Sequence, residues 1–185
     1  MGSTGVNVLS MVAAAVIIAG LVLMSVRKRH SRKLREQFGP EYDRVVRKEG
    51  NASKAERVLE FRQKRLEKFK VRRLTPTDRA RYRYRWNEVQ SRFVEDPKVA
   101  IALAETLVAD VMQARGYPTA DFEQQAADIS VEHPMVVGNY RAAHDIALRH
   151  SRGQASAEDL RSAMGHYRAL FLELLDDSQP QKRGA

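Results

Sequence analysis

Cysteine is absent from this 185-residue chain, and its absence excludes disulfide bridges, zinc ribbons, thiol nucleophiles and iron–sulfur clusters. The sequence also has no Gly-rich phosphate loop, no G-x-S-x-G elbow and no E-x-x-H pair. Four histidines follow His30, and none lies three or four residues from another, the spacing that places two imidazoles on one metal-binding helix face. We therefore expect no catalytic, cofactor-binding or metal-binding residues, and we interpret the protein as not an enzyme. An enzyme that acts near the membrane is the least favoured of the alternative functions.

Charge is absent from the first 26 residues, which contain no Asp, Glu, Lys or Arg. The apolar run Val6–Val26 has the length of about 20 residues that a helix needs to cross a bilayer. A cleaved signal peptide is the alternative, but no basic residue precedes the run and no A-x-A pattern ends it. We predict an uncleaved transmembrane anchor over residues 1–26. Ala15 and Ala19 form a small-xxx-small pair on it, which makes a homo-oligomer one possible partner arrangement.

A basic cluster follows the run directly and predicts the orientation of the chain. Loops on the cytoplasmic side of a membrane carry the excess of Lys and Arg, so we expect a single-pass protein of the cell membrane with its N-terminus outside and its C-terminal domain in the cytoplasm. We expect the cluster to lie at the membrane surface against anionic headgroups. Its members are Arg27, Lys28, Arg29, Arg32, Lys33 and Arg35.

The net charge of +9 is unevenly distributed along the chain. Residues 27–92 contain 23 Lys and Arg against 9 Asp and Glu, a net charge of +14, whereas residues 93–185 carry −5. Proximity to anionic lipid explains this division, because each basic residue near the headgroups gains about 1 kcal/mol. The alternative is a membrane-tethered nucleic-acid-binding protein that uses the basic region 27–92.

Residues 27–74 are predicted to form a basic juxtamembrane helical linker. Gly39 and Pro40 break the first helix, a short helix follows over residues 41–49, and Ser53 opens a helix that runs to Arg73. This last helix either lies on the membrane surface or is an exposed bundle or coiled-coil helix, and we favour the second because its apolar stripe is thin. The stripe consists of Val58, Leu59, Phe61, Leu66 and Phe69.

Residues 75–177 are predicted to form a helical bundle domain, and residues 178–185 a disordered tail. No alternating strand pattern of useful length occurs, so the fold class is all-α, with about five helices in the bundle. Caps and prolines place these helices at 76–95, 97–115, 120–132, 134–152 and 157–176. In the second of them we expect six residues to face inward: Val99, Leu103, Leu107, Val108, Val111 and Met112.

Alternating basic and aromatic residues occupy the start of the first bundle helix. Such a pattern is typical of surfaces that hold phosphates and stack bases. On a helix, however, Tyr82 and Trp86 point to one side, so we expect these aromatics in the core and the arginines on a solvated or lipid-facing surface. The candidate contacts to a partner or phosphate are Arg79, Arg81, Arg83 and Arg85.

Five distinctive motifs are spread over the chain. They are FGPEYDR (Phe38–Arg44), W-x-x-x-Q-x-x-F-V-x-D-P (Trp86–Pro97), RGYPTADFEQQAADISVEHP (Arg115–Pro134), NYRAAHDIA (Asn139–Ala147) and DLRSAMGHYRALFLELL (Asp159–Leu175). Together they resemble a family of uncharacterised bacterial proteins with one N-terminal membrane helix. The resemblance covers nearly the whole chain and implies a bacterial source and a membrane location, but it names no activity and no functional residue. We therefore expect a membrane-anchored helical protein-interaction module whose partner is unknown.

Overall fold

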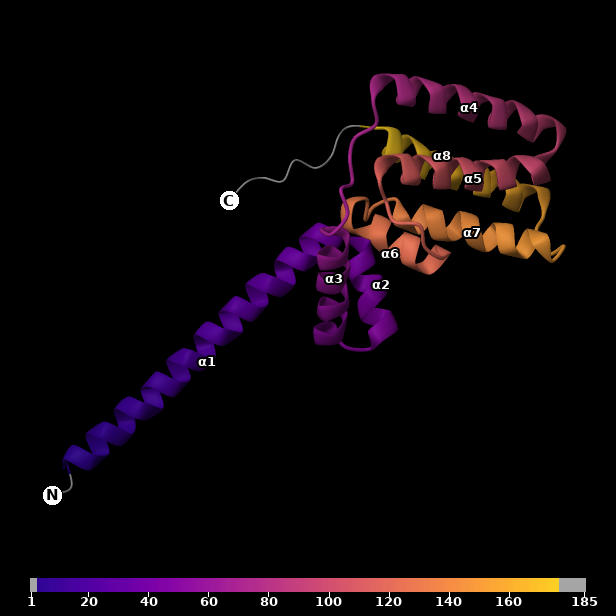
Figure 1. Ribbon diagram of the computed structural model, residues 1–185. Helices are drawn as coiled ribbons and strands as arrows, with labels where there is room; N and C mark the ends of the chain where they lie inside the picture. Colours follow the sequence, from indigo (N-terminus) through magenta and orange to yellow (C-terminus); the bar gives the residue numbers. More distant parts are fainter. Residues whose placement is uncertain (1–2, 177–185) are drawn as a thin grey trace.

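A computed structural model describes residues 3–176 of the chain, with side chains from residue 18 onward. All regular structure in this part of the chain is helical, which confirms the all-α class. Figure 1 shows one long helix that projects from a body of shorter ones. The eight helices of the described residues are α1 (Ser3–Phe38), α2 (Pro40–Glu49), α3 (Ala52–Leu66), α4 (Pro76–Glu95), α5 (Pro97–Arg115), α6 (Phe122–Glu132), α7 (Val137–Ser151) and α8 (Ala157–Leu175).

Helices α4 to α8 form the predicted bundle around one apolar core. Helix α8 packs against both α5 and α7, and α4 packs against α5 (Figure 1). Trp86 of α4 stacks on Phe171 of α8 with ring centroids 4.6 Å apart, so the predicted inward aromatic is in the core. Tyr82, the other aromatic residue predicted to point inward, is buried one turn before Trp86 on α4. Buried apolar side chains from all five helices contribute to this core.

The end of α1 packs with α2 and α3 around a second, smaller core, and we call this unit, residues 27–66, the neck. Gly39 turns the chain from α1 into α2 with φ +47°, a conformation that favours glycine. Residues 27–74, expected as a linker, thus contain a packed helical unit. Its core consists of Leu34, Phe38, Tyr42, Val45, Ala55 and Leu59.

Several helix caps occur where the sequence predicts them. The side chain of Thr75 accepts a hydrogen bond from the backbone of Asp78 at the start of α4, and Asp96 caps α5 in the same way. Ser156 and Asp159 form a complete capping box on α8. Three other helix starts were predicted wrongly. Asn51, not Ser53, caps α3. Helix α6 begins at Phe122 rather than at residue 120, and α7 begins at Val137 rather than at residue 134.

Helix α3 ends at Leu66 and does not continue to Arg73 as predicted. The chain instead crosses to the bundle, where the Arg72 amide donates to the Arg115 carbonyl at 2.8 Å. At Gly116, with φ +90°, a Cβ atom would lie only 2.7 Å from the Lys70 carbonyl oxygen. Glycine is therefore required here both by the backbone conformation and by the approach of the connecting segment.

Some apolar residues of the predicted stripes are exposed. Phe61, on the predicted apolar stripe of α3, is 67% exposed, whereas its neighbour Arg62 is buried, because α3 turns a polar stripe toward the bundle. Val99 and Leu103 on α5 are 41% and 43% exposed. Near its N-terminal end α5 buries Ala100 instead, since α4 and α8 pack against the adjacent face.

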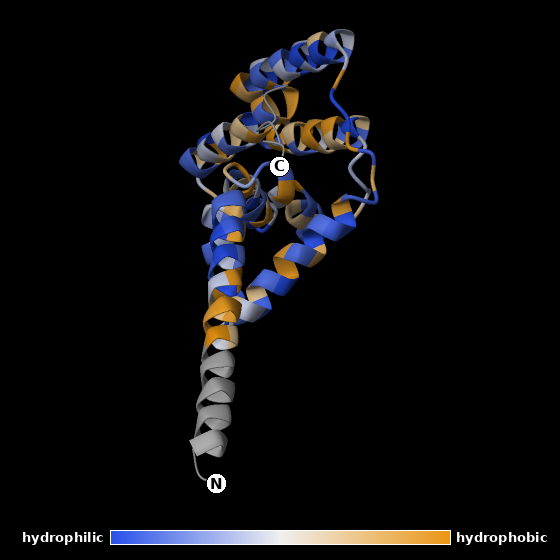
Figure 2. Cartoon of the chain, turned by 90° about the vertical axis from the view of Figure 1, so that its left-hand side faces the viewer, coloured by the Kyte–Doolittle hydropathy of each residue, from blue (hydrophilic) through white to orange (hydrophobic). Residues whose placement is uncertain are grey.

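The apolar N-terminal segment belongs to α1, which continues without a break into the neck. Figure 2 shows apolar residues on α1 next to the uncoloured segment, and hydrophilic residues beyond them. Among the residues searched, no helix of the structure has both the length and the apolar character required to span a bilayer. The side chains of residues 6–17, most of the predicted span, lie outside the described residues, as does the predicted tail 178–185.

Candidate functional site

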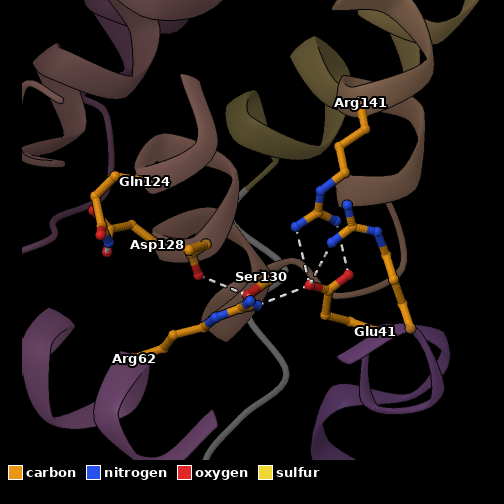
Figure 3. A network of polar contacts seen from close by, with 8 residues as sticks. Glu41, Arg62, Gln124, Asp128, Ser130 and Arg141 are labelled. Atoms are coloured by element: carbon orange, nitrogen blue, oxygen red, sulfur yellow. Dashed lines mark hydrogen bonds and ion pairs between the residues drawn. The ribbon is translucent and has the colours of Figure 1, made fainter. Parts of the chain in front are cut away.

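A buried cluster of charged side chains joins the neck to the bundle. Glu41, at the start of α2, is only 2% exposed. Its carboxylate accepts hydrogen bonds from Arg62 of α3 at 2.8 Å and from Arg141 of α7 at 2.7 and 3.0 Å. Arg44 lies 3.7 Å away on α2 itself. Figure 3 shows these guanidinium groups converging on Glu41 from three helices.

The same interface contains a second ion pair on α6. Asp128 is fully buried and accepts from Arg65 of α3 at 3.1 Å and from Gln124 at 2.8 Å (Figure 3). Arg62 also donates to the Ser130 hydroxyl of α6 at 3.0 Å, so the same helix contacts both charged groups of α3. We call Glu41, Arg62, Arg65, Asp128, Ser130 and Arg141 the interface network.

The interface network connects α2 and α3 of the neck to α6 and α7 of the bundle. Burial lowers the pKa of the Arg141 guanidinium, and the adjacent Glu41 carboxylate opposes that effect. Buried charges carry a large desolvation cost, so removing one partner of a pair destabilises the structure. The charge-assisted hydrogen bonds of the network therefore favour the docked position of the neck.

The six basic residues that follow the apolar run are all exposed, as expected of a surface cluster. Arg32 pairs with Glu36 at 3.0 Å and Arg35 with Asp43 at 2.9 Å. These six basic residues divide into two sets. Four of them line a hollow between α1 and the start of α3, and the other two do not. We call this hollow the basic groove; it is lined by Arg27, Lys28, Arg32 and Arg35 of α1 and by Ser53 and Glu56 of α3.

The four arginines predicted to contact a partner or phosphate lie on the outer side of α4. Arg81 pairs with Asp78 at 2.9 Å and Arg85 with Asp110 of α5 at 2.8 Å. Both guanidinium groups also lie within 6 Å of the Tyr82 ring centre. Arg83 is exposed, whereas Arg79 is half-buried and also interacts with another residue. Three of the four are therefore engaged within the fold, which reduces their availability for phosphates.

Titratable groups from three helices meet at the side of α7. His144 Nδ1 lies 2.9 Å from the Glu105 carboxylate, and the Phe122 ring stacks on the imidazole at 3.6 Å. Burial raises the pKa of the Tyr140 and Tyr167 phenols, and the charge of Glu105 raises both further. Neither surface hollow described in this structure is lined by these residues. The cluster packs and orients α7.

A second polar cluster is buried where α5, α6 and α8 meet, and the sequence motifs did not reveal it. Arg115 donates to a backbone carbonyl of α8 at 3.0 Å and lies 3.3 Å from His133 Nε2. On its other side His133 lies 3.1 Å from Glu173. Burial lowers the pKa of His133, an effect that Glu173 opposes and Arg115 increases. We expect a neutral imidazole that accepts from Arg115 and donates to Glu173.

No group of His, Asp and Glu side chains with the arrangement of a metal site occurs among the residues that were searched. None of the family models, curated proteins or solved structures compared with the chain matches it. The resemblance to a bacterial single-pass family therefore stays a prediction from the sequence motifs.

Proposed function

We propose that this protein is a membrane-anchored interaction module, in which residues 1–26 cross a bacterial cell membrane and the neck holds the bundle at the cytoplasmic surface. The observation that carries the proposal is the rigid path from anchor to bundle. Helix α1 runs unbroken from the apolar segment to Phe38, and the interface network fixes the neck against α6 and α7. A flexible linker would be enough to localise a domain, whereas a fixed orientation serves binding in a defined geometry.

The exposed apolar residues of α1 support the anchor. Between residues 18 and 26, large side chains are more than half exposed, among them Leu21, Leu23 and Met24. Apolar surface of this extent is covered in a functional protein, and lipid is the cover that suits an isolated charge-free helix. The basic cluster that follows supports the cytoplasmic orientation.

The bundle surface supports binding to a protein partner. Val94, at the joint between α4 and α5, is 85% exposed, and Val99 and Leu103 lie one turn apart on α5 near that joint. Exposed apolar side chains of this kind are typical of partner-binding surfaces when they gather at one end of a domain.

In-cell crosslinking of the full chain tests the interaction. A photoreactive amino acid replaces Val94, and membranes are isolated after illumination. We expect a discrete adduct with a protein or with a second copy of the chain, and a weaker one when Glu41→Gln loosens the neck. A strictly monomeric chain without adducts would contradict the proposal.

Two further measurements test the anchor and its direction. The chain should remain in the membrane pellet after an alkaline carbonate wash, and release into the supernatant would contradict the anchor. A reporter active only in the periplasm, fused after Ala185, should stay inactive. Activity of that reporter with an uncleaved anchor would show that the orientation is opposite.

A further inference from the structure

The basic groove is a built hollow with a volume of about 600 Å³. This lies within the range of roughly 300–1,000 Å³ that is typical of sites for small ligands. Four basic side chains and one carboxylate line it, so the lining carries a net charge of +3. An anionic ligand of small-molecule size therefore fits both its volume and its charge.

Hydrogen bonds between the two walls hold the groove in shape. Arg27 donates to the Ser53 hydroxyl at 2.6 Å, so α1 and the first turn of α3 are tied at its mouth. Glu56 accepts from Ser31 and, at 3.0 Å, from the Tyr42 hydroxyl. These contacts satisfy the one acidic side chain of the lining from within the fold.

Some N–H donors of the basic side chains in the groove remain free to bind a ligand. Arg27 has five N–H donors and uses one for Ser53. The ammonium group of Lys28 has three N–H donors and makes no hydrogen bond or ion pair to another residue in the described part of the chain. Arg32 and Arg35 each share their charge with one exposed carboxylate. Lys28 and Arg27 are thus the principal donors.

The groove lies at the depth where lipid phosphates occur. Met24, from the apolar end of α1, lines one end of it, and Arg35 lies about 12 Å further along the helix from Arg27 by the rise of 1.5 Å per residue. The polar layer of each leaflet is about 5–8 Å thick. With the apolar segment in the bilayer, Arg27 and Lys28 lie within that layer.

We propose that the basic groove binds the phosphate-bearing headgroup of one anionic phospholipid, with Lys28 and Arg27 as the direct donors. This inference rests on the membrane anchoring proposed above. The first turn of α3, through Ala52 and Ser53, lines the groove as well, and the positive end of a helix dipole favours an anion there. The bound lipid would join anchor and neck into one unit at the membrane surface.

A pair of matched double variants tests the groove. Lys28→Gln with Arg32→Gln removes two charges from its lining, whereas Arg29→Gln with Lys33→Gln removes one Lys and one Arg from the same stretch but outside the lining. The full chain is reconstituted in nanodiscs of equal parts phosphatidylglycerol and phosphatidylcholine. Native mass spectrometry then gives the ratio of the two lipids that the released protein retains.

The wild-type protein should retain phosphatidylglycerol in preference. Because the first double variant loses the charge-assisted hydrogen bonds of Lys28, it should lower that preference at least about tenfold, whereas the second leaves the lining intact and should change it less than about threefold. An equal loss of the preference for phosphatidylglycerol in both double variants would refute a specific site in the groove and indicate diffuse attraction by surface charge. Displacement of the retained lipid by soluble glycerol 3-phosphate would overturn a lipid as the ligand, and displacement by a DNA duplex would indicate nucleic acid instead.

Flotation separates this inference from the proposed function. A chain that floats with pure phosphatidylcholine vesicles, yet retains no anionic lipid in preference, refutes the headgroup site and leaves the anchor intact. A chain that floats with no vesicle refutes the anchor, and the headgroup site with it.

Discussion

Glu41→Gln tests whether buried charges hold the neck on the bundle. The substitution keeps the size of the side chain but removes the negative charge that Arg62 and Arg141 share at 2.7 to 3.0 Å. Arg44, at 3.7 Å, then adds a third positive charge without compensation. Removing one partner of a buried ion pair costs about 3–5 kcal/mol, because the remaining charges stay desolvated. We expect the docking of the neck to lose about this free energy.

Hydrogen exchange of the full chain in detergent, read by mass spectrometry, measures the loss. Amides of α2 and α3 exchange when the neck opens, so a loss of 3–5 kcal/mol should speed their exchange by roughly two to four powers of ten. The bundle has its own core and should keep its protection. Fluorescence of Trp86, the single tryptophan, checks that the bundle stays folded.

Glu36→Gln is the matched control. It removes the same charge from an exposed pair with Arg32 on α1, and such pairs contribute about 1 kcal/mol or less. If Glu41→Gln changes the exchange of α2 and α3 no more than this control does, the interface network does not hold the neck and the rigid path from anchor to bundle is wrong.

Three further predictions concern the bundle. Because the pKa of His133 is lowered in the folded state, the protein should be fully stable above about pH 6.5 and should lose stability as the pH falls below that value. Thermal unfolding at several pH values measures this dependence of stability on pH, and His133→Gln should remove it. Phe171→Ala should cost about 3–5 kcal/mol by chemical denaturation, whereas the exposed Phe61→Ala should cost less than about 1 kcal/mol, and equal losses would contradict the assigned core. Hydrogen bonds at the start of α8 lower the pKa of Asp159 to about 2, so Asp159→Asn should destabilise the protein at neutral pH. The difference in unfolding free energy between the variant and the wild type should shrink as the pH falls from about 4 toward 2. A difference that does not change with pH would contradict the charged cap.

Local signals in the sequence were sufficient to place the starts of α4, α5 and α8. Thr75, Asp96 and Ser156 each precede a helix at the position where their side chains satisfy free backbone amides, and this requirement depends only on neighbouring residues. The one-sided placement of Tyr82 and Trp86 follows in the same way from the helical repeat. These features act within a turn or two of the chain, so periodicity and caps reveal them.

The candidate site was less accessible to sequence reasoning. The basic cluster could be recognised as a membrane-surface segment, but its division between groove and solvent depends on where α3 begins beside α1. On α3 the apolar stripe was misleading, since Phe61 is exposed and Arg62 is buried. A buried arginine has the same local pattern as an exposed one.

Residue patterns alone were enough to predict the all-α class, most helix boundaries of the bundle, and the sharp change from an uncharged segment to a strongly basic one. The packing of the neck, the burial of Glu41 and its contacts with Arg62 and Arg141 become visible only in the folded chain. The two groups of features differ in how far apart the interacting residues lie along the chain. Caps and periodicity depend on groups within four residues, whereas the partners of Glu41 lie 21 and 100 residues away and become its neighbours only when α3 and α7 pack together.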